Sequence, residues 1–231
     1  MIQAHALDPD VRLELAPAGP SLDAEVAAAV DRLWDAEMAA RGAGLFDGPL
    51  FSLLEHSPGR LSARAVTYRQ LIASRRDPEL ARRIGLRPMG VTGLLLSPEG
   101  VVLGRRSQGL HTEPGRWEPA PAGALDRLDW RAVLLAELAE ELGLTADAVS
   151  GPEAVALIED LGTGVHDILC RVRTRLGADQ ITAAWRAGGT DEYDELAVLA
   201  PDALEGFLSR NADALSPTLR PMLRAGGLLA A

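Results

Sequence analysis

The sequence predicts an α+β protein in which a mixed β-sheet packs between helices, with a small α/β extension at its N-terminus. Three observations carry this prediction. The segment MGVTGLLLSPEGVVLGRRS, from Met89, joins two apolar runs through a Pro-Glu-Gly turn and is the strongest hairpin signal in the chain. One amphipathic helix follows a long Gly/Pro-rich loop, and further strand-like runs come after it. The segment before Met89 has strand and helix patterns of its own, so we expect an extension over residues 1–86 and a main domain over 87–231.

The extension is expected to contain strands and two helices. The alternating run VRLEL, residues 11–15, predicts a strand. Apolar side chains fall on one face of a helix expected over residues 22–41, after a serine cap. Two short strands are expected on either side of a Ser-Pro-Gly turn at 57–59, followed by a second helix over 69–84 that a glycine and a proline end.

The main domain continues after the hairpin with a loop over residues 110–123 and a helix over 130–142, which Gly143 ends. A polar Gly-rich loop, GGTDEYDELAVLAP, precedes the last strand. The remaining expected elements are strands over 153–160, 166–174 and 195–199 and helices over 201–209 and 217–225.

Composition excludes several classes of protein. The 231 residues include 33 acidic side chains against 23 basic ones, all of them arginine, for a net charge of −10. A chain this acidic lacks the basic footprint of nucleic-acid binding, so no nucleic-acid partner is expected. The chain has no N-terminal apolar run and no uninterrupted apolar stretch near membrane-spanning length, so we expect no membrane partner and a cytoplasmic location. Cys170 is the only cysteine, which excludes an internal disulfide.

Three glutamates, Glu137, Glu140 and Glu141, share one face of the helix expected over 130–142. At about 100° per residue they span an arc of roughly 100°, and a leucine stripe lies about a third of a turn away. Like charges at this spacing repel one another by a few tenths of a kcal/mol, so the cluster is unfavourable in isolation. A bound Mg²⁺ or Mn²⁺ would neutralise it, since these ions prefer oxygen ligands. From the helix alone, a solvated acidic face is the favoured alternative.

The loop before the helix changes that balance. Residues 115–144, GRWEPAPAGALDRLDWRAVLLAELAEELGL, resemble the Nudix box, G-x5-E-x7-R-E-U-x-E-E-x-G-U. The tail ELAEELGL matches every fixed position of E-U-x-E-E-x-G-U, and Gly123 falls at the opening glycine. The chain is therefore similar to the Nudix hydrolases, which bind Mg²⁺ through this loop and helix and cleave nucleoside diphosphates linked to another moiety. The resemblance implies a Nudix α/β/α sandwich and an Mg²⁺ (or Mn²⁺) cofactor. It gives metal-binding and catalytic roles to Glu137, Glu140 and Glu141, and places Gly123 among the substrate-binding residues.

The box departs from the family pattern at three places. The family's arginine, which buttresses the carboxylates, is Ala136 here. The spacing from Gly123 to Glu137 is one residue short, and the family's first glutamate is at best Asp129. Arg131 is close in sequence, but the helical wheel places it on the aliphatic side, so it is an uncertain substitute.

A group of atypical Nudix hydrolases, which cleave UDP-glucose to UMP and glucose 1-phosphate, also replaces this arginine. The chain resembles that group in an N-terminal α/β extension and in the segments VLGRRS, TYRQL and GGTDEYDEL. The implied partner is a small nucleoside diphosphate derivative, and a homodimer is left open. Two alternatives remain. One is a Nudix hydrolase of ADP-ribose, a dinucleotide, coenzyme A or a prenyl diphosphate, and the other is an inactive Nudix-fold module that only binds its ligand.

Four charged residues and one tryptophan outside the helix are further candidates. Arg105 and Arg106 end a strand, so only one of them can point into the site, where it would pair with a diphosphate; a surface charge pair is the alternative. The acidic loop offers Glu192 or Glu195 as the general base, a role that some Nudix enzymes draw from this loop; a solvated loop is the alternative. Trp117 is a substrate-binding candidate that would stack on a base, although packing below the box is favoured.

Overall fold

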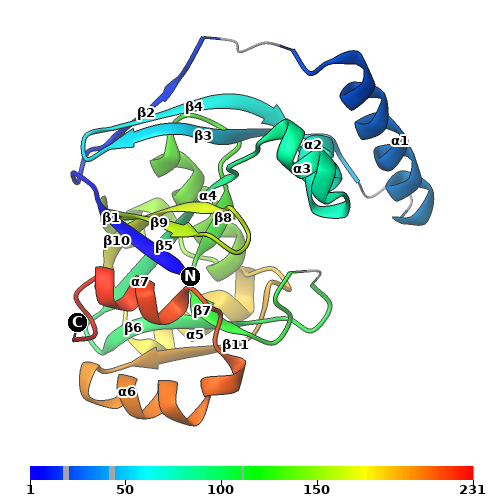
Figure 1. The fold of residues 1–231 in the computed structure, drawn as a ribbon. Coiled ribbons are helices and arrows are strands. Elements are labelled where there is room, and N and C mark those ends of the chain that lie inside the picture. The colour runs from blue at the N-terminus through cyan, green and yellow to red at the C-terminus, as the bar shows by residue number, and fades with distance from the viewer. Residues whose placement is uncertain (18–20, 42–44, 111, 231) are drawn as a thin grey trace.

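The computed structural model describes residues 1–17, 21–41, 45–110 and 112–230, which form two β-sheets with helices around them (Figure 1). The large sheet has the strand order β1-β9-β10-β5-β6-β11, with β7 paired to β6 and β8 paired to β5. β5 and β10 run parallel while the other neighbours are antiparallel, so the sheet is mixed. Its strands are β1 (Ile2–Ala6), β5 (Met89–Ser97), β6 (Gly100–Arg106), β7 (Trp117–Pro119), β8 (Ala122–Ala124), β9 (Val149–Asp160), β10 (His166–Thr174) and β11 (Tyr193–Leu199).

Helices cover both faces of the large sheet. Leucines of α4 (Trp130–Leu142) and Ile181 of α5 (Ala178–Gly188) pack into one apolar cluster. On the other face, α6 (Pro201–Arg210) and α7 (Leu219–Ala225) pack into a second cluster. This α/β/α sandwich confirms the predicted α+β class. No helix in the described ranges is long and apolar enough to span a membrane.

The sheet opens between β5 and β6. These strands pair directly only beside their turn, where Leu96 faces Val101 and Ser97 faces Gly100. Further along, β8 pairs with β5 and β7 pairs with β6, so two three-residue strands occupy the place of a continuous ladder. The segment after β8 leads directly into α4. The helix that holds Glu137, Glu140 and Glu141, called the glutamate helix below, therefore lies beside this opening.

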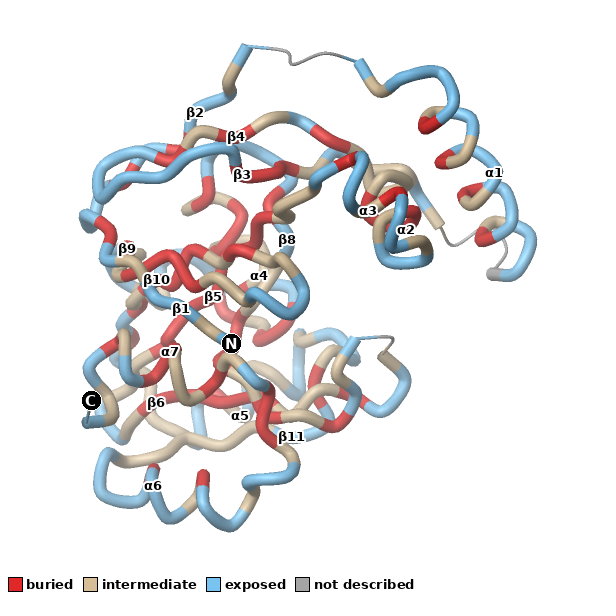
Figure 2. Tube along the Cα trace, in the orientation of Figure 1, coloured by how far each residue is buried: buried red, intermediate tan, exposed pale blue. Residues whose placement is uncertain are grey.

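The extension forms a second, three-stranded sheet of order β2-β4-β3 and a group of helices. Its elements are β2 (Arg12–Leu15), α1 (Ala24–Arg41), β3 (Pro49–Ser57), β4 (Arg60–Thr67), α2 (Tyr68–Arg76) and α3 (Pro78–Ile84). The helices α1, α2 and α3 share a small apolar cluster of their own. Figure 2 shows α1 as a largely exposed helix with buried positions along one side.

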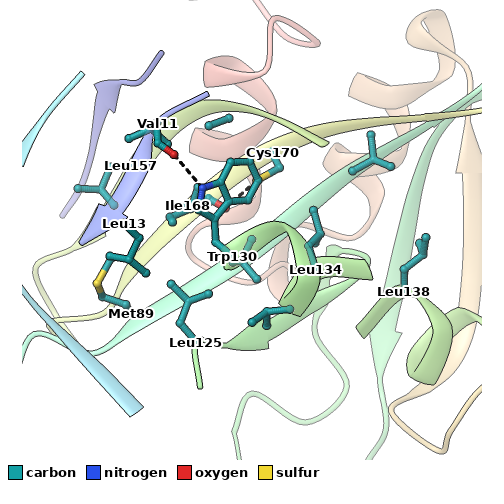
Figure 3. Packing of buried hydrophobic residues seen from close by; sticks show 14 of the residues in the cluster. Val11, Leu13, Met89, Leu125, Trp130, Leu134, Leu138, Leu157, Ile168 and Cys170 are labelled. Atoms are coloured by element: carbon teal, nitrogen blue, oxygen red, sulfur yellow. Dashed lines mark hydrogen bonds between the residues drawn. The ribbon is translucent and has the colours of Figure 1, made fainter. Parts of the chain in front are cut away.

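The first strand and the small sheet are tied to the main sandwich. β1 pairs antiparallel with β9 and so forms an edge of the large sheet. Val11 and Leu13 belong to the same apolar cluster as Trp130 of α4, and the Trp130 indole N–H donates to the Val11 carbonyl at 3.0 Å (Figure 3). The boundary at residue 86 stays a prediction, while the core beneath α4 includes residues from both sides of it.

Several predicted elements are confirmed and others need correction. The strands of the hairpin, the helix Trp130–Leu142 and the strand His166–Thr174 lie where the sequence predicts them. The single helix expected over 69–84 is instead α2 and α3, because Asp77 caps a new helix that begins at Pro78. The loop over 110–123 contains β7 and part of β8. β1 and α5 were not predicted.

Three of the four histidines gather where β1, β3, β9 and β10 approach one another. The ring centroids of His5 and His56 lie 4.6 Å apart, and Glu159 bridges His5 at 3.3 Å and His166 at 3.1 Å. Burial and the positive charge of Arg87 lower the pKa of His166; burial, His5 and Arg87 lower that of His56. Both imidazoles are therefore favoured in the neutral form in the folded protein.

These lowered pKa values predict acid sensitivity. Below the unfolded pKa of about 6.5, the unfolded chain binds more protons than the folded one, so the free energy of unfolding falls as the pH falls. We expect a loss of at most about 1.4 kcal/mol per pH unit from the buried His166, and a smaller one from the exposed His56. Urea midpoints from pH 7.5 to pH 5.5 measure it, and His166→Gln should flatten the profile. An unchanged slope in that variant would contradict the prediction.

Candidate functional site

Both ends of α4 are set by local chemistry. The Asp129 side chain caps the helix by accepting a hydrogen bond from the Ala132 N–H at 3.1 Å. Gly143 ends it in the left-handed conformation, at φ 64°, which glycine adopts without strain. Asp129, the nearest equivalent of the first glutamate of the box, uses its carboxylate as a helix cap, and its correspondence to that glutamate stays a prediction.

The three helix glutamates lie in different environments. Glu141 is 5% exposed, and its Oε2 accepts hydrogen bonds from the Ala122 N–H at 3.1 Å and the Tyr193 hydroxyl at 3.0 Å. Burial raises the pKa of Glu141 to about 9. Glu137 is partly buried, and burial followed by repulsion from Glu140 raises its pKa to about 7. Glu140 is exposed. The site therefore contains two sheltered carboxylates and one at its rim.

Gly123 lies directly against the Glu137 carboxylate. A Cβ built on Gly123 would lie 2.1 Å from Glu137 Oε1, so only glycine leaves room for the glutamate at this distance. β8, which holds Gly123, also supplies the Ala122 N–H that binds Glu141. The short strand thus contacts both sheltered carboxylates.

Gly123→Ala is expected to displace Glu137. The added methyl group must push the carboxylate aside, which typically costs about 1–3 kcal/mol of stability and, for a shift near 1 Å in a site, about 100-fold in rate. Turnover and urea unfolding of the purified variant measure the two effects. Gly109→Ala is the matched control, because a Cβ at Gly109 would have no neighbour within 4 Å. Equal effects of the two substitutions would contradict the assignment.

The register of β6 decides which arginine faces the glutamates. A Cβ on Gly104 would lie 2.5 Å from the Tyr193 ring, so Gly104, and Arg106 two residues later, face Tyr193 and α4. The Arg106 guanidinium contacts Glu118 Oε1 at 2.7 Å and Glu192 Oε1 at 2.9 Å. Burial raises the pKa of Glu118 to about 7 despite this partner.

Arg105 points the other way. It pairs with Trp117 across the strands, and Trp117 packs edge-on against Phe207 of α6 with ring centroids 5.0 Å apart. The Arg105 side chain is 42% exposed and lies 3.7 Å from Glu195, its partner in β11. Directly paired side chains share a face of the sheet, so Arg105 and Glu195 lie on the face away from the helix glutamates.

These positions decide among the candidates outside the helix. Trp117 is 3% exposed in the α6–α7 core, which confirms the favoured expectation that it packs, and its ring is not available to stack on a base. Glu195 lies on the opposite face and is not placed to act as the base. Glu192 remains the candidate from the acidic loop, on the site face. Arg106 also faces the site, but its guanidinium is engaged by Glu118 and Glu192.

The donor set suits a divalent cation in its chemistry. Glu137 and Glu141 offer hard carboxylate oxygens, their pKa values are raised by burial, and no basic side chain of the described residues hydrogen-bonds to either. Within the same ranges, however, no three His, Cys, Asp or Glu side chains are placed to hold one ion together. The predicted three-glutamate centre is not assembled, and the role of Glu140 as a ligand stays a prediction.

Ala136 leaves the helix without the arginine of the box, and Arg131 does not replace it. The Arg131 guanidinium donates to the carbonyls of Pro9 at 2.8 Å and Pro152 at 3.1 Å, and it stacks on Trp130 at 4.1 Å. Its contacts are with the extension and β9. The partners of Glu141 are a tyrosine hydroxyl and a backbone amide.

Tyr193 and Glu118 are site residues that sequence reasoning did not single out. Both occur in segments with a recognisable pattern, GGTDEYDEL and WEPAPAG. Their importance comes from the pairing of β11 and β7 with β6, which no local spacing reveals. The preference of a buried tyrosine for a hydrogen-bond partner was the one available signal.

Comparison with known proteins supports the fold. No family model matches the chain, and no curated protein matches its sequence. Among solved structures, the protein DR0079 from Deinococcus radiodurans has a TM-score of 0.52 at 21% identity, covering 76% of this chain and 97% of that one. That coverage exceeds what residues 87–231 alone could supply. A MutT protein from Methanosarcina mazei (18% identity, TM-score 0.45, 61% of this chain and 91% of that one) and an Ap4A hydrolase from C. elegans (15%, 0.44, 61% and 95%) are more distant. At 21% identity the first likeness establishes the fold alone.

Proposed function

We propose that the chain is a Nudix-type diphosphatase that hydrolyses the diphosphate linkage of a small nucleoside diphosphate derivative with a divalent cation, Mg²⁺ or Mn²⁺. The observation that carries this proposal is the pair of sheltered carboxylates, Glu137 and Glu141, held against β8 by Gly123 and Ala122. Neither carboxylate, with pKa values of about 7 and about 9, hydrogen-bonds to a basic side chain of the described residues, so both suit a cation. The match of ELAEELGL to the tail of the Nudix box supports the same assignment.

The cation, with Glu137 and Glu141 as its ligands, would polarise the diphosphate and lower the pKa of a bound water. Glu192 is the residue we assign to accept the proton of the attacking water. Arg106 holds the Glu192 carboxylate at 2.9 Å and so fixes it on the site face. The same guanidinium binds Glu118 at 2.7 Å, so two carboxylates hold Arg106 in place. We therefore assign Arg106 the role of orienting Glu192, and not that of binding phosphate.

Within this class we propose a nucleoside diphosphate sugar similar to UDP-glucose as the substrate, with UMP and glucose 1-phosphate as products. The support is the N-terminal extension, the segments VLGRRS and GGTDEYDEL, and the replacement of the box arginine by Ala136. ADP-ribose, dinucleotides, coenzyme A and prenyl diphosphates are the alternative substrates. Cytoplasmic location and a homodimer stay predictions.

A hydrolysis panel tests the proposal. The purified chain is incubated with UDP-glucose, ADP-ribose, a dinucleoside polyphosphate, coenzyme A and a prenyl diphosphate, with Mg²⁺, with Mn²⁺ and with EDTA. The expected result is cation-dependent release of nucleoside monophosphate, fastest from UDP-glucose, with Glu195→Gln as active as the wild type. A chain that binds one of these compounds without cation dependence or turnover would instead be a binding module. Faster cleavage of another compound would replace the sugar nucleotide as substrate.

A further inference from the structure

We propose that Tyr193 is a positioning residue that holds the Glu141 carboxylate in place of the basic side chain that Ala136 does not provide. This inference rests on the proposed function, because it concerns how one of the two proposed cation ligands is oriented. The hydrogen bond of the Tyr193 hydroxyl is to Glu141. It acts through Glu141.

The contact between Tyr193 and Glu141 is buried. Tyr193 is 3% exposed and Glu141 is 5% exposed, and the hydroxyl donates to Glu141 Oε2 at 3.0 Å. The Ala122 N–H donates to the same oxygen at 3.1 Å. Both hydrogen bonds described for this carboxylate therefore meet on Oε2, which fixes the direction in which Oε1 points.

The surrounding structure is shaped to hold the tyrosine ring. A Cβ on Gly104 would lie 2.5–2.8 Å from three ring atoms, so the ring packs directly on the backbone of β6. A register shift in β11 follows Tyr193, between it and Glu195. The loop before β11 is anchored to the helix, because the Thr190 N–H donates to the Glu140 carbonyl at 2.8 Å. Strand, loop and helix together leave the hydroxyl little freedom to move away from Glu141.

A neutral donor has a different consequence from a cationic one. An arginine would orient the carboxylate and also place a positive charge beside it, whereas a tyrosine hydroxyl orients it without adding a charge. A divalent cation bound at Glu141 would therefore meet no competing positive charge from Tyr193. Loss of the hydroxyl should weaken cation binding, since partners that orient a metal ligand typically contribute about 10–100-fold to metal affinity.

Tyr193→Phe removes the hydroxyl and keeps the ring on Gly104. We expect Mn²⁺, titrated by calorimetry without substrate, to bind about 10-fold more weakly or worse, and kcat to fall with KM for the nucleotide substrate unchanged. Tyr68→Phe, at the only other tyrosine of the chain, is the matched control in α2 and should behave as the wild type. Mn²⁺ affinity equal to the wild type in Tyr193→Phe would overturn the proposal.

A second measurement uses the wild-type protein and does not depend on the folding of a variant. With two tyrosines in the chain, ¹³Cζ-tyrosine labelling yields two signals. Addition of Mg²⁺ should shift the signal of Tyr193 and leave that of Tyr68, assigned by its phenylalanine variant, in place. If neither signal moves under saturating Mg²⁺, the proposal fails. The Mn²⁺ affinity and the tyrosine signals do not depend on turnover. If the wild type binds Mn²⁺ more tightly than Tyr193→Phe but hydrolyses no substrate, the proposed function fails and the role of Tyr193 stands.

Discussion

Glu141→Gln is expected to abolish hydrolysis while making the folded protein more stable at alkaline pH. The glutamate is 5% exposed and has no basic partner among the described residues, so burial raises its pKa to about 9. Glu141 is one of the two proposed cation ligands, and its loss should lower the rate of hydrolysis at least about 100-fold. Glutamine retains an oxygen that can accept from Tyr193 and Ala122, so the hydrogen bonds that shape the site are kept.

The sign of the stability effect follows from proton linkage. The pKa of Glu141 is higher in the folded than in the unfolded state, so its contribution to stability is fully present below the unfolded pKa of about 4.5 and is lost as the pH rises towards about 9. By pH 8 the wild type should have lost a few kcal/mol that a glutamine, which does not ionise, retains.

Urea unfolding at pH 5, 7 and 9, without divalent cations, measures this difference. The two proteins should be nearly equal at pH 5 and the variant more stable at pH 9. Glu195→Gln is the control, since that side chain is 57% exposed on the opposite face and should change neither activity nor the pH profile. A variant that is active, or that is less stable than the wild type at pH 9, would contradict the prediction.

Arg106→Met is expected to be the most destabilising single change at the site. It removes the guanidinium that contacts both Glu118 and Glu192 and leaves the sheltered Glu118 without its partner. Breaking a buried ion pair from one side typically costs about 3–5 kcal/mol. The deficit should grow between pH 6 and pH 8, because Glu118, whose pKa is already about 7, then has to carry its charge unpaired.

Arg105→Met provides the matched comparison at the adjacent position. Its guanidinium is half-exposed and lies 3.7 Å from Glu195, so we expect a change within about 0.5 kcal/mol. Denaturant midpoints of both variants at pH 6 and pH 8 test the pair. Similar losses of stability in the two variants would contradict the assignment of Arg106 and Arg105 to opposite faces of β6.

Local signals account for the elements that could be predicted. The bounds of α4 follow from an aspartate cap, a leucine stripe and a closing glycine, all readable in the sequence. β1 could not be predicted in the same way, because its pairing partner β9 lies about 150 residues further along the chain. α5 was not predicted, although Ile181, Ala184 and Trp185 lie at helical spacing and pack into the core beside α4. β7 and β8 have three residues each, too few for an alternating pattern.

The site residues also fall into two groups: some are predicted by local patterns, and the others are revealed only by packing between distant segments. Helical periodicity places Glu137, Glu140 and Glu141 on one arc, but only the packing of β8 and Tyr193 shelters Glu141 and leaves Glu140 exposed. Strand alternation predicts that one of two neighbouring arginines faces the site. The register with β7 and β11 is needed to decide which one.

The hydrogen bond between Trp130 and the Val11 carbonyl has a consequence for how the protein folds. It joins residues 119 positions apart, and Val11 and Leu13 complete the apolar core on which the glutamate helix rests. Contacts at such separation require the closure of a long loop before they stabilise anything, which slows folding. The helix α4 should therefore acquire its native environment late, after the chain's first dozen residues have packed against it.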